Sequence, residues 1–414
     1  MAATAILRRM SRRILVIGAG QAAAQCIDAL RRNGFDGSIT LLGSEPQLPY
    51  QRPPLSKKYL AGSLEPDRLL LKHRPFYDEH QIVLHLGTRA MAVDRAGQTV
   101  KDAEGRSHPY DALVLATGSR ARRLAVPGAE LGGVHYLRSL DDADALRSAA
   151  LRGQRALIIG GGYIGLEAAA TLRAMNLAVT VLETTTRLMS RVVCAPVSEF
   201  YRQEHQRHGV SIVLNAQLTE LVSNEHGMVA AARCADGREY PADLVLVGIG
   251  VQAEDQLARD AGLDCDNGIR VDQYCRSSDP RILAIGDCCN FEVAHYGLQV
   301  RLESVDNAFE QGTTAALQLL GTPVAHDKVP WFWSDQYDHK MLIVGLSQQH
   351  DQLVLRGDPA SGAFSACYLR GGELIAIDTV NQARDQMAAR RMIAARARPD
   401  PARLADPTIA LKDC

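Results

Sequence analysis

The sequence has 414 residues, enough for two or three domains that each have a core. Its formal net charge of −1 and charged content of 22% are typical of a globular protein and give no sign of nucleic-acid binding. No apolar run approaches the roughly 20 residues of a membrane span, and we expect no membrane association. The basic segment 1–13 lacks the apolar core of a secretory signal, which leaves a basic tail or an organelle transit peptide.

Nine cysteines are scattered along the sequence without a C-x-x-C pair. This pattern favours reduced thiols in the cytoplasm over a disulfide framework or a zinc site, and we expect no bound metal. We interpret the adjacent Cys288 and Cys289 as small buried residues, because neighbouring cysteines rarely meet disulfide geometry. No redox-active dithiol is evident.

The first predicted element is a buried parallel strand at 14–17, because its apolar run is continuous. Gly18 and Gly20 follow, and Ala23 takes the place of a third glycine, which completes G-x-G-x-x-A. The first glycine permits a tight turn, the second lets the backbone approach a pyrophosphate, and the small third residue lets helix pack on strand. The helix N-terminus then offers free N–H groups to the anion. The motif predicts a dinucleotide site, although an ordinary glycine-rich turn carries the same letters.

After a predicted strand at 38–43, Glu45 is the candidate acid for ribose hydroxyls, the alternative being an exposed loop glutamate. Prolines stiffen the next segment, LPYQRPPLSK, so Arg52 and Lys57 are presented with little entropy left to lose. We therefore predict that both cations contact a cofactor, although a surface turn would also explain the prolines.

Another buried strand is predicted at 110–115, and it ends in Ala116, Thr117 and Gly118. Small residues at the carboxyl end of a parallel strand let a ligand approach the backbone closely. This short motif is common in proteins, so it supports a ligand site only together with the other motifs.

A second glycine-rich unit begins after the apolar run 156–159. Its motif residues are Gly160, Gly162, Tyr163, Ile164 and Gly165. Glu183 ends the next predicted strand about 20 residues past the glycines, where a carboxylate binds a ribose diol and repels a 2′-phosphate. This predicts NADH rather than NADPH, a preference that the nearby Arg187 would weaken. Two such units predict a protein that binds two dinucleotides.

Two later strands end in residues that packing alone explains poorly. The strand predicted at 242–247 precedes Gly250, which suits a close approach to the nicotinamide nucleotide. The strand predicted at 282–285 ends in Gly286 and Asp287. Because burying an unpaired carboxylate is costly, Asp287 is predicted to bind a ligand.

A third region carries both tryptophans, Trp331 and Trp333, which mark either the core of a small domain or a cofactor wall. Strands are predicted at 342–345 and 374–377, followed by a helix at 386–398. Arginines on this helix form a solvated face or help to dock an acidic protein partner.

In combination, LPYQRPPLSK, the two glycine-rich units, IGD at 285–287 and PWFWSDQY at 330–337 resemble the FAD-containing NADH:ferredoxin reductases. These are of the putidaredoxin reductase and biphenyl-dioxygenase ferredoxin reductase type, related to the oxidoreductase part of apoptosis-inducing factor. The resemblance covers nearly the whole chain. It implies an α/β fold with two Rossmann-like dinucleotide-binding domains and a small α+β C-terminal domain. The implied domains are a discontinuous FAD-binding domain at 12–119 and 249–327, an inserted NAD-binding domain at 120–248, and a C-terminal interface domain at 328–414.

The resemblance also implies roles for single residues. Lys57 and Glu167 would lie together beside the flavin, and Tyr163 would cover the flavin face until nicotinamide displaces it. Glu303 matches a carboxylate near the nicotinamide carboxamide, and is otherwise an acid at a helix N-terminus. The resemblance also implies that residues 116–118 and Trp333 contact FAD, and that Asp287 contacts its ribityl chain.

The implied reaction passes a hydride from NADH to FAD and single electrons to a [2Fe–2S] ferredoxin, which feeds a Rieske dioxygenase or a haem monooxygenase. The missing dithiol favours this branch over the disulfide reductases. The alternatives are an NADH oxidase, a rubredoxin- or nitrite-type reductase, and an NADH-sensing flavoprotein like apoptosis-inducing factor. We expect a monomer or homodimer. The sequence departs from the family pattern at 381–385, which predicts a different partner surface.

Overall fold

The computed structural model describes residues 13–414, so residues 1–12 of the basic N-terminal segment lie outside the described residues. The described chain forms two compact units. Unit 1 contains residues 13–51, 67–120 and 252–328, and unit 2 contains residues 52–66, 121–251 and 329–414. Two of the points where the chain passes from one unit to the other lie in β8 (Ser119–Ala121) and β17 (Val251–Ala253), which pair as a two-stranded sheet.

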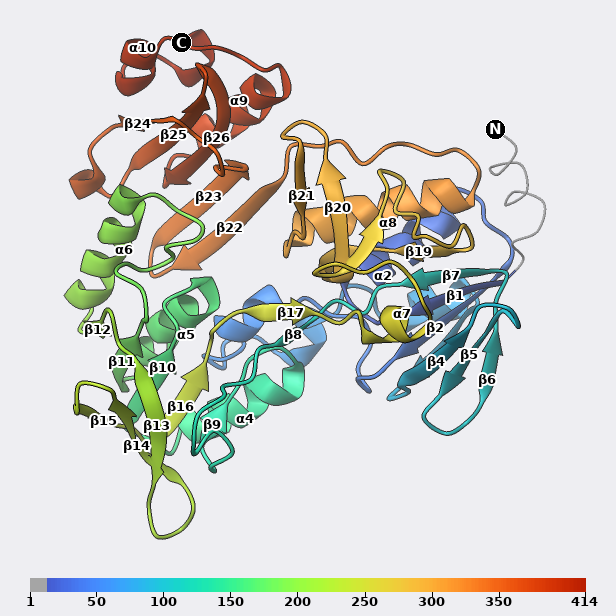
Figure 1. The fold of residues 1–414 in the computed structure, drawn as a ribbon, viewed down its shortest axis with the longest axis horizontal. Helices are drawn as coiled ribbons and strands as arrows, with labels where there is room; N and C mark the ends of the chain where they lie inside the picture. Colours follow the sequence, from blue (N-terminus) through green and yellow to red (C-terminus); the bar gives the residue numbers. More distant parts are fainter. Residues whose placement is uncertain (1–12) are drawn as a thin grey trace. The chain divides into compact units, whose positions relative to one another are not determined.

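Unit 1 is built on a parallel sheet with the strand order β19-β7-β1-β2-β3. Its strands are β1 (Arg13–Ile17), β2 (Ser38–Gly43), β3 (Ile82–Leu86), β7 (Ala112–Leu115) and β19 (Ile282–Ala284). The continuous apolar runs of β1, β7 and β19 are buried, as predicted for strands covered on both faces. Helices α2 (Gln21–Arg32) and α8 (Val305–Leu319) pack side by side and share the core of this sheet (Figure 1).

Smaller elements complete unit 1. They are the helices α3 (Arg74–Glu79) and α7 (Gln256–Asp260), the antiparallel strands β4 (Ala90–Asp94), β5 (Thr99–Asp102) and β6 (Ser107–Pro109), and the sheet of β18 (Ile269–Val271), β20 (Cys289–Val293) and β21 (Leu298–Val300).

Unit 2 repeats the parallel arrangement with the strand order β12-β11-β10-β16-β9. These strands are β9 (Val134–His135), β10 (Arg155–Ile159), β11 (Ala178–Leu182), β12 (Ser211–Val213) and β16 (Leu244–Val247). Its other elements are α4 (Leu140–Ala150), α5 (Tyr163–Ala174), α6 (Ala195–Arg207), and the antiparallel β13 (Leu218–Ser223), β14 (Val229–Cys234) and β15 (Glu239–Pro241).

Unit 2 also contains the C-terminal antiparallel sheet, ordered β22-β23-β26-β25-β24. Its elements are β22 (Trp331–Gln336), β23 (His339–Gly345), β24 (Gln352–Arg356), β25 (Phe364–Arg370), β26 (Glu373–Val380), α9 (Ala383–Ala394) and α10 (Pro401–Ala405). The predicted strands at 342–345 and 374–377 lie inside β23 and β26. The predicted last helix begins and ends earlier than expected, since Arg396 has a φ of 52°, outside the helical region.

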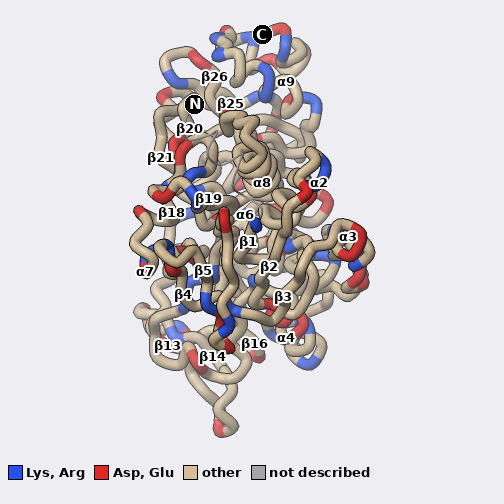
Figure 2. The backbone as a smooth tube through the Cα atoms, turned by 90° about the vertical axis from the view of Figure 1, so that its right-hand side faces the viewer, with Lys and Arg blue, Asp and Glu red and all other residues tan. Residues whose placement is uncertain are grey.

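The two parallel sheets and the antiparallel C-terminal sheet agree with the predicted fold class. The three domain boundaries predicted from the resemblance remain a prediction. Figure 2 shows cationic and anionic residues interspersed along the chain, in line with the 46 Lys and Arg and the 47 Asp and Glu residues of the sequence. Within residues 13–414, no helix is both long enough and apolar enough to cross a bilayer.

Candidate active site

In unit 1, the carboxyl edge of the parallel sheet collects the predicted FAD-binding residues of that unit. Ile17 is in register with Leu42 and Leu115, and Leu115 with Ala284, so these strands end side by side. The predicted residues that follow these strand ends are Gly18, Gly20, Glu45, Ala116, Thr117, Gly118, Gly286 and Asp287. They come from four separate stretches of sequence, and the strand order makes them neighbours.

The two motif glycines of unit 1 are required for different reasons. Gly18 has a φ of 105°, and a Cβ there would lie 2.1 Å from the carbonyl oxygen of Ala116, so the turn admits no side chain. At Gly20, the N-cap of α2, a Cβ would meet nothing within 4 Å and no side chain caps the helix. Ala23 is fully buried beneath. The N–H groups of α2 are therefore open to an anion, as the pyrophosphate of FAD requires.

Asp287 lies in the short 3-10 turn Gly286–Cys288 that follows β19. Its carboxylate accepts a hydrogen bond of 2.8 Å from the Ser119 hydroxyl. The side-chain oxygen of Gln311 accepts a 2.7 Å bond from the N–H of Gly286 and so fixes this turn. Neither Ser119 nor Gln311 was predicted from the sequence, since each is far from Asp287 along the chain. Glu45, the other predicted acid of this edge, accepts a 2.5 Å bond from the Tyr50 hydroxyl.

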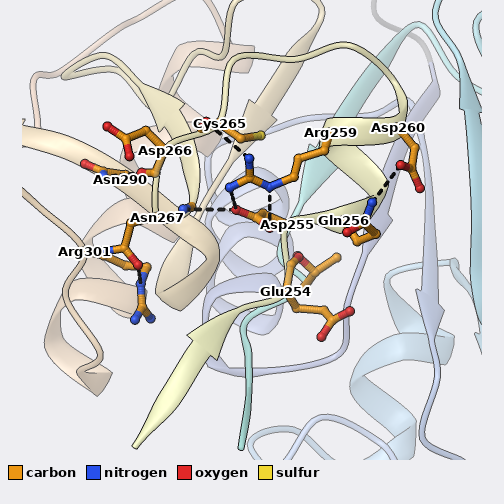
Figure 3. A network of polar contacts seen from close by, with 12 residues as sticks. Glu254, Asp255, Gln256, Arg259, Asp260, Cys265, Asp266, Asn267, Asn290 and Arg301 are labelled. Atoms are coloured by element: carbon orange, nitrogen blue, oxygen red, sulfur yellow. Dashed lines mark hydrogen bonds and ion pairs between the residues drawn. The ribbon is translucent and has the colours of Figure 1, made fainter. Parts of the chain in front are cut away.

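Glu303 is paired with Arg301 at 2.7 Å. The Arg301 side chain is only 7% exposed, and it also donates to the backbone carbonyl of Asp287 (3.3 Å) and to the side chain of Asn267 (3.4 Å). Figure 3 shows Arg301 beside the Asn267 turn. One buried guanidinium thus links Glu303 with the Asp287 turn, a connection that the sequence did not indicate.

The nucleotide edge of unit 2 has the same construction. Ile159 is in register with Leu182 and Val247, and the predicted residues that follow these strands are Gly160, Gly162, Gly165, Glu183 and Gly250. A Cβ would lie 2.4 Å from a carbonyl oxygen at Gly160 and 2.2 Å from one at Gly165. At Gly162, the N-cap of α5, it would meet nothing within 4 Å. A second pyrophosphate fits at this open helix N-terminus.

Glu183 is held in a fixed orientation by backbone donors. One carboxylate oxygen accepts a 2.7 Å bond from the N–H of Gly161, and the other accepts a 2.8 Å bond from the N–H of Thr185. Arg187 donates to two carbonyl groups of the following loop. Because its guanidinium is engaged in holding that loop, Arg187 is a weaker candidate for a 2′-phosphate than the sequence allowed.

A buried ion pair joins Lys57 to Glu167 at 2.5 Å, and the Glu167 side chain is only 3% exposed. The Ser56 hydroxyl donates to the same carboxylate oxygen as Lys57 (2.6 Å), and the Ser334 hydroxyl donates to the other oxygen (2.7 Å). Both oxygens of this buried anion therefore have donors, which is the condition for burying a charge. Ser56 and Ser334 were not predicted from the sequence.

The aromatic residues of β22 divide between its two faces, because side chains alternate along a strand. Phe332 contacts the ring of Tyr163 at a centroid distance of 4.7 Å, and Trp333 contacts Trp331 at 5.6 Å. Among the described residues, no hydrogen-bond partner reaches the buried Tyr163 hydroxyl. The neighbouring Ile164 is 45% exposed. The flavin contact of Trp333 remains a prediction.

The remaining predicted cation, Arg52, belongs to unit 2. It precedes the short 3-10 helix η1 (Pro53–Ser56), which the paired prolines initiate, and its guanidinium donates a 2.6 Å bond to the carbonyl of Arg138. The cofactor contact of Arg52 remains a prediction.

Two parallel sheets, each with an open helix N-terminus at its carboxyl edge, define a protein that binds two dinucleotides. The family model described as pyridine nucleotide-disulphide oxidoreductase matches residues 12–312, and the one described as reductase C-terminal matches residues 331–414. The chain belongs to the pyridine nucleotide-disulphide oxidoreductase family. The predicted cofactors, FAD and NAD(H), are confirmed with the family.

Named relatives show which members of this family the chain resembles. The chain is 42% identical over 400 residues to the 5,5'-dehydrodivanillate O-demethylase ferredoxin reductase subunit of Sphingobium sp., covering 96% of this chain and 97% of that protein. It is 42% identical over 399 residues to rhodocoxin reductase of Rhodococcus erythropolis, covering 96% and 93%. The crystal structure of the covalent putidaredoxin reductase–putidaredoxin complex matches with a TM-score of 0.94 at 40% identity, covering 97% of each chain. The predicted resemblance to ferredoxin reductases and the predicted fold class are confirmed.

Proposed function

We propose that this protein passes electrons from NADH through FAD to a [2Fe–2S] ferredoxin that feeds a Rieske dioxygenase or a haem monooxygenase. The observation that carries the proposal is the buried Lys57–Glu167 pair in a stretch without cysteine, since none lies between Cys26 and Cys194. A disulfide reductase needs a dithiol beside its flavin. Relatives named as the ferredoxin–NAD(+) reductase component of dioxygenase systems, and one named as the ferredoxin reductase subunit of an O-demethylase, support ferredoxin as the acceptor.

FAD, when bound, accepts a hydride from NADH and returns electrons one at a time. The chain's own part is to bind and orient. The N-termini of α2 and α5 hold the two pyrophosphates, and Glu183 holds the ribose diol of NADH. Glu167 fixes the ammonium group of Lys57, which would polarise the bound flavin. Glu303, fixed by Arg301, orients the nicotinamide carboxamide.

The FAD-binding domain then corresponds to 12–119 and 249–327, the NAD-binding domain to 120–248, and the interface domain to 328–414. We place the protein in the cytoplasm, because its nine cysteines are free thiols without a C-x-x-C pair, a pattern typical of a reducing compartment.

The test is anaerobic double-mixing stopped-flow absorbance. NADH is mixed with the yellow holoenzyme, and a [2Fe–2S] ferredoxin follows in the second push. Fast bleaching followed by reoxidation by ferredoxin supports the proposal. Bleaching into a stable long-wavelength band that ferredoxin does not discharge would indicate the NADH-sensing alternative, and rapid oxygen consumption without ferredoxin would indicate an oxidase. Absence of bleaching would contradict the NADH-dependent reaction.

A further inference from the structure

We propose that Ser334, Gln336, His205 and Tyr337 form a one-directional hydrogen-bond relay that positions the Glu167 carboxylate, and through it Lys57, for flavin reduction. The proposal rests on the proposed function for its kinetic consequence. Its structural content, the direction of the relay, does not depend on that function.

The relay consists of four consecutive contacts within unit 2. The Ser334 hydroxyl donates to Oε1 of Glu167 (2.7 Å), and Nε2 of Gln336 donates to the Ser334 oxygen (3.2 Å). Oε1 of Gln336 lies 2.9 Å from Nε2 of His205, and Nδ1 of His205 lies 3.0 Å from the Tyr337 hydroxyl. β22 carries Ser334 and Gln336 on one face, and α6 contributes the histidine.

The carboxylate at one end fixes the direction of every bond. An ionised Glu167 only accepts, so Ser334 must give its single proton to it. The serine oxygen then accepts from the amide N–H of Gln336, which leaves the amide oxygen facing His205. His205 must therefore carry its proton on Nε2, and its Nδ1 accepts from the Tyr337 hydroxyl. All four donors are oriented toward Glu167.

The relay is buried and its outer end is tightly held. Ser334, Gln336 and His205 are fully buried. The ring of Tyr337 stacks on His208 with centroids 3.7 Å apart, and its backbone adopts a φ of 54°. Tyr337 is the first residue of the two-residue turn between the paired Gln336 and His339, and such a hairpin turn requires a positive φ at that position.

His205 is neutral at pH 7, as the relay requires. Burial is the main reason that its pKa falls to about 4, while the hydrogen bond to Gln336 acts in the opposite direction. The titratable groups that face it are Glu204 from its own helix, His208 at the C-cap of that helix, and Tyr337 from the β22–β23 turn. Glu204 favours the protonated ring and His208 opposes it.

The relay limits how far the Glu167 carboxylate can rotate. Lys57 and Ser56 engage Oε2, and within the described chain Ser334 is the hydrogen-bond donor to Oε1. Aligned donors in a buried chain polarise one another, so the serine donates more strongly than it would alone. Without Ser334, the carboxylate loses its second anchor and can rotate away from the position that holds Lys57.

The kinetic test uses Ser334→Ala in the holoenzyme. We expect the limiting rate of flavin reduction by NADH to fall about tenfold, the effect of one charge-assisted hydrogen bond, while the apparent Kd for NADH changes less than about twofold. Ser334→Thr keeps the hydroxyl and should restore the rate. Ser365→Ala is the matched control, because Ser365 is equally buried in the same sheet and donates to Asp385 at 2.8 Å.

A double-mutant cycle separates positioning from general damage. If Ser334 acts through Glu167, Ser334→Ala should change the rate less than about twofold in a Glu167→Gln background. An undiminished tenfold loss in that background would overturn the proposal. So would a wild-type rate in Ser334→Ala, or an equal loss of rate in the Ser365→Ala control.

The second readout does not use activity. In ¹⁵N-histidine-labelled holoenzyme, with His205→Asn to assign the signal, we expect His205 to be neutral with its proton on Nε2 at pH 7. A proton on Nδ1 would reverse the relay and overturn the proposal. If NADH fails to bleach the wild type, the proposed function is wrong, but the NMR result still decides the direction of the relay.

Discussion

At the scale of single residues, Lys57 shows how a charge is kept available in a buried setting. Its ammonium group is 2.5 Å from Glu167, and its side chain is still 20% exposed. The carboxylate is surrounded by donors, so the cation is held in one place. A point charge fixed in this way is suited to act on a cofactor, because it needs no reorganisation when the reaction occurs.

We therefore expect Lys57→Ala to retain FAD and to reduce the rate of flavin reduction by NADH at least about tenfold, a loss of about 1.4 kcal/mol of transition-state stabilisation. The variant leaves Glu167 buried without its cation, so a lower melting temperature is also expected. Stopped-flow rates per bound FAD separate the two effects. Lys58→Ala, the exposed neighbour, is the control. An unchanged rate in Lys57→Ala would refute the role.

Glu183 supports a second prediction, on nucleotide preference. Its carboxylate is oriented by the N–H groups of Gly161 and Thr185, and it would repel a 2′-phosphate. We expect Glu183→Ala to reduce the ratio of kcat/KM for NADH to that for NADPH by about tenfold, since the repulsion is removed. Full reversal is not expected, because Arg187 is engaged by backbone carbonyls. Glu225→Ala, on the surface, should leave the ratio unchanged; if Glu183→Ala also does, the ribose assignment is wrong.

At the scale of elements, each strand–turn–helix unit separates a glycine needed for folding from one needed for binding. A Cβ at Gly160 would collide with the carbonyl of Gly248, while a Cβ at Gly162 would meet nothing within 4 Å. We expect Gly162→Ala to keep the melting temperature of the NADH-free protein and to weaken NADH binding. Gly160→Ala should instead lower the melting temperature. Thermal unfolding and NADH titration test the pair, and wild-type affinity in Gly162→Ala would place the pyrophosphate elsewhere.

The elements also show how far sequence reasoning reaches. The two glycine-rich units and Glu183 were predictable, because a strand, its turn and the next helix are coded within one short stretch. The hydrogen bond from Ser334 to Glu167 was not, since Ser334 comes from a strand far along the chain. β26 is buried almost throughout, because it is a central strand covered on both faces. Such tertiary contacts leave no periodic signal in a single sequence.

At the scale of the whole molecule, Asp378 departs from the rule that buried charges are paired. It is 1% exposed in the middle of β26, and it accepts a hydrogen bond from the Tyr368 hydroxyl. Among the described residues, its other oxygen has no hydrogen-bond partner. Burial therefore raises the pKa of Asp378 to about 7. The unfolded chain would release this proton near pH 4, so the folded state binds a proton that the unfolded state lacks between about pH 4 and 7.

This difference makes the stability of the protein depend on pH in a defined direction. The stabilisation is complete below about pH 4 and is lost as the pH rises through 7. Asp378→Asn removes the titration and keeps an oxygen for Tyr368. We expect its gain in the free energy of unfolding over wild type to be about 3 kcal/mol larger at pH 8 than at pH 5, since each pKa unit corresponds to about 1.4 kcal/mol.

Urea unfolding of both proteins at pH 5 and pH 8 measures this difference. The groups that interact with Asp378 are Tyr163, Tyr201, Tyr368, Cys194 and Cys367, and burial raises the pKa of each, so none of them titrates in this window. His205 acts in the opposite direction, because its lowered pKa reduces stability as the pH falls below about 6.5. Because His205 is present in both proteins, its contribution to the pH dependence cancels when they are compared. If wild type and variant respond equally to pH, Asp378 is ionised in the folded protein, and the Tyr368 hydroxyl alone suffices to stabilise a buried charge.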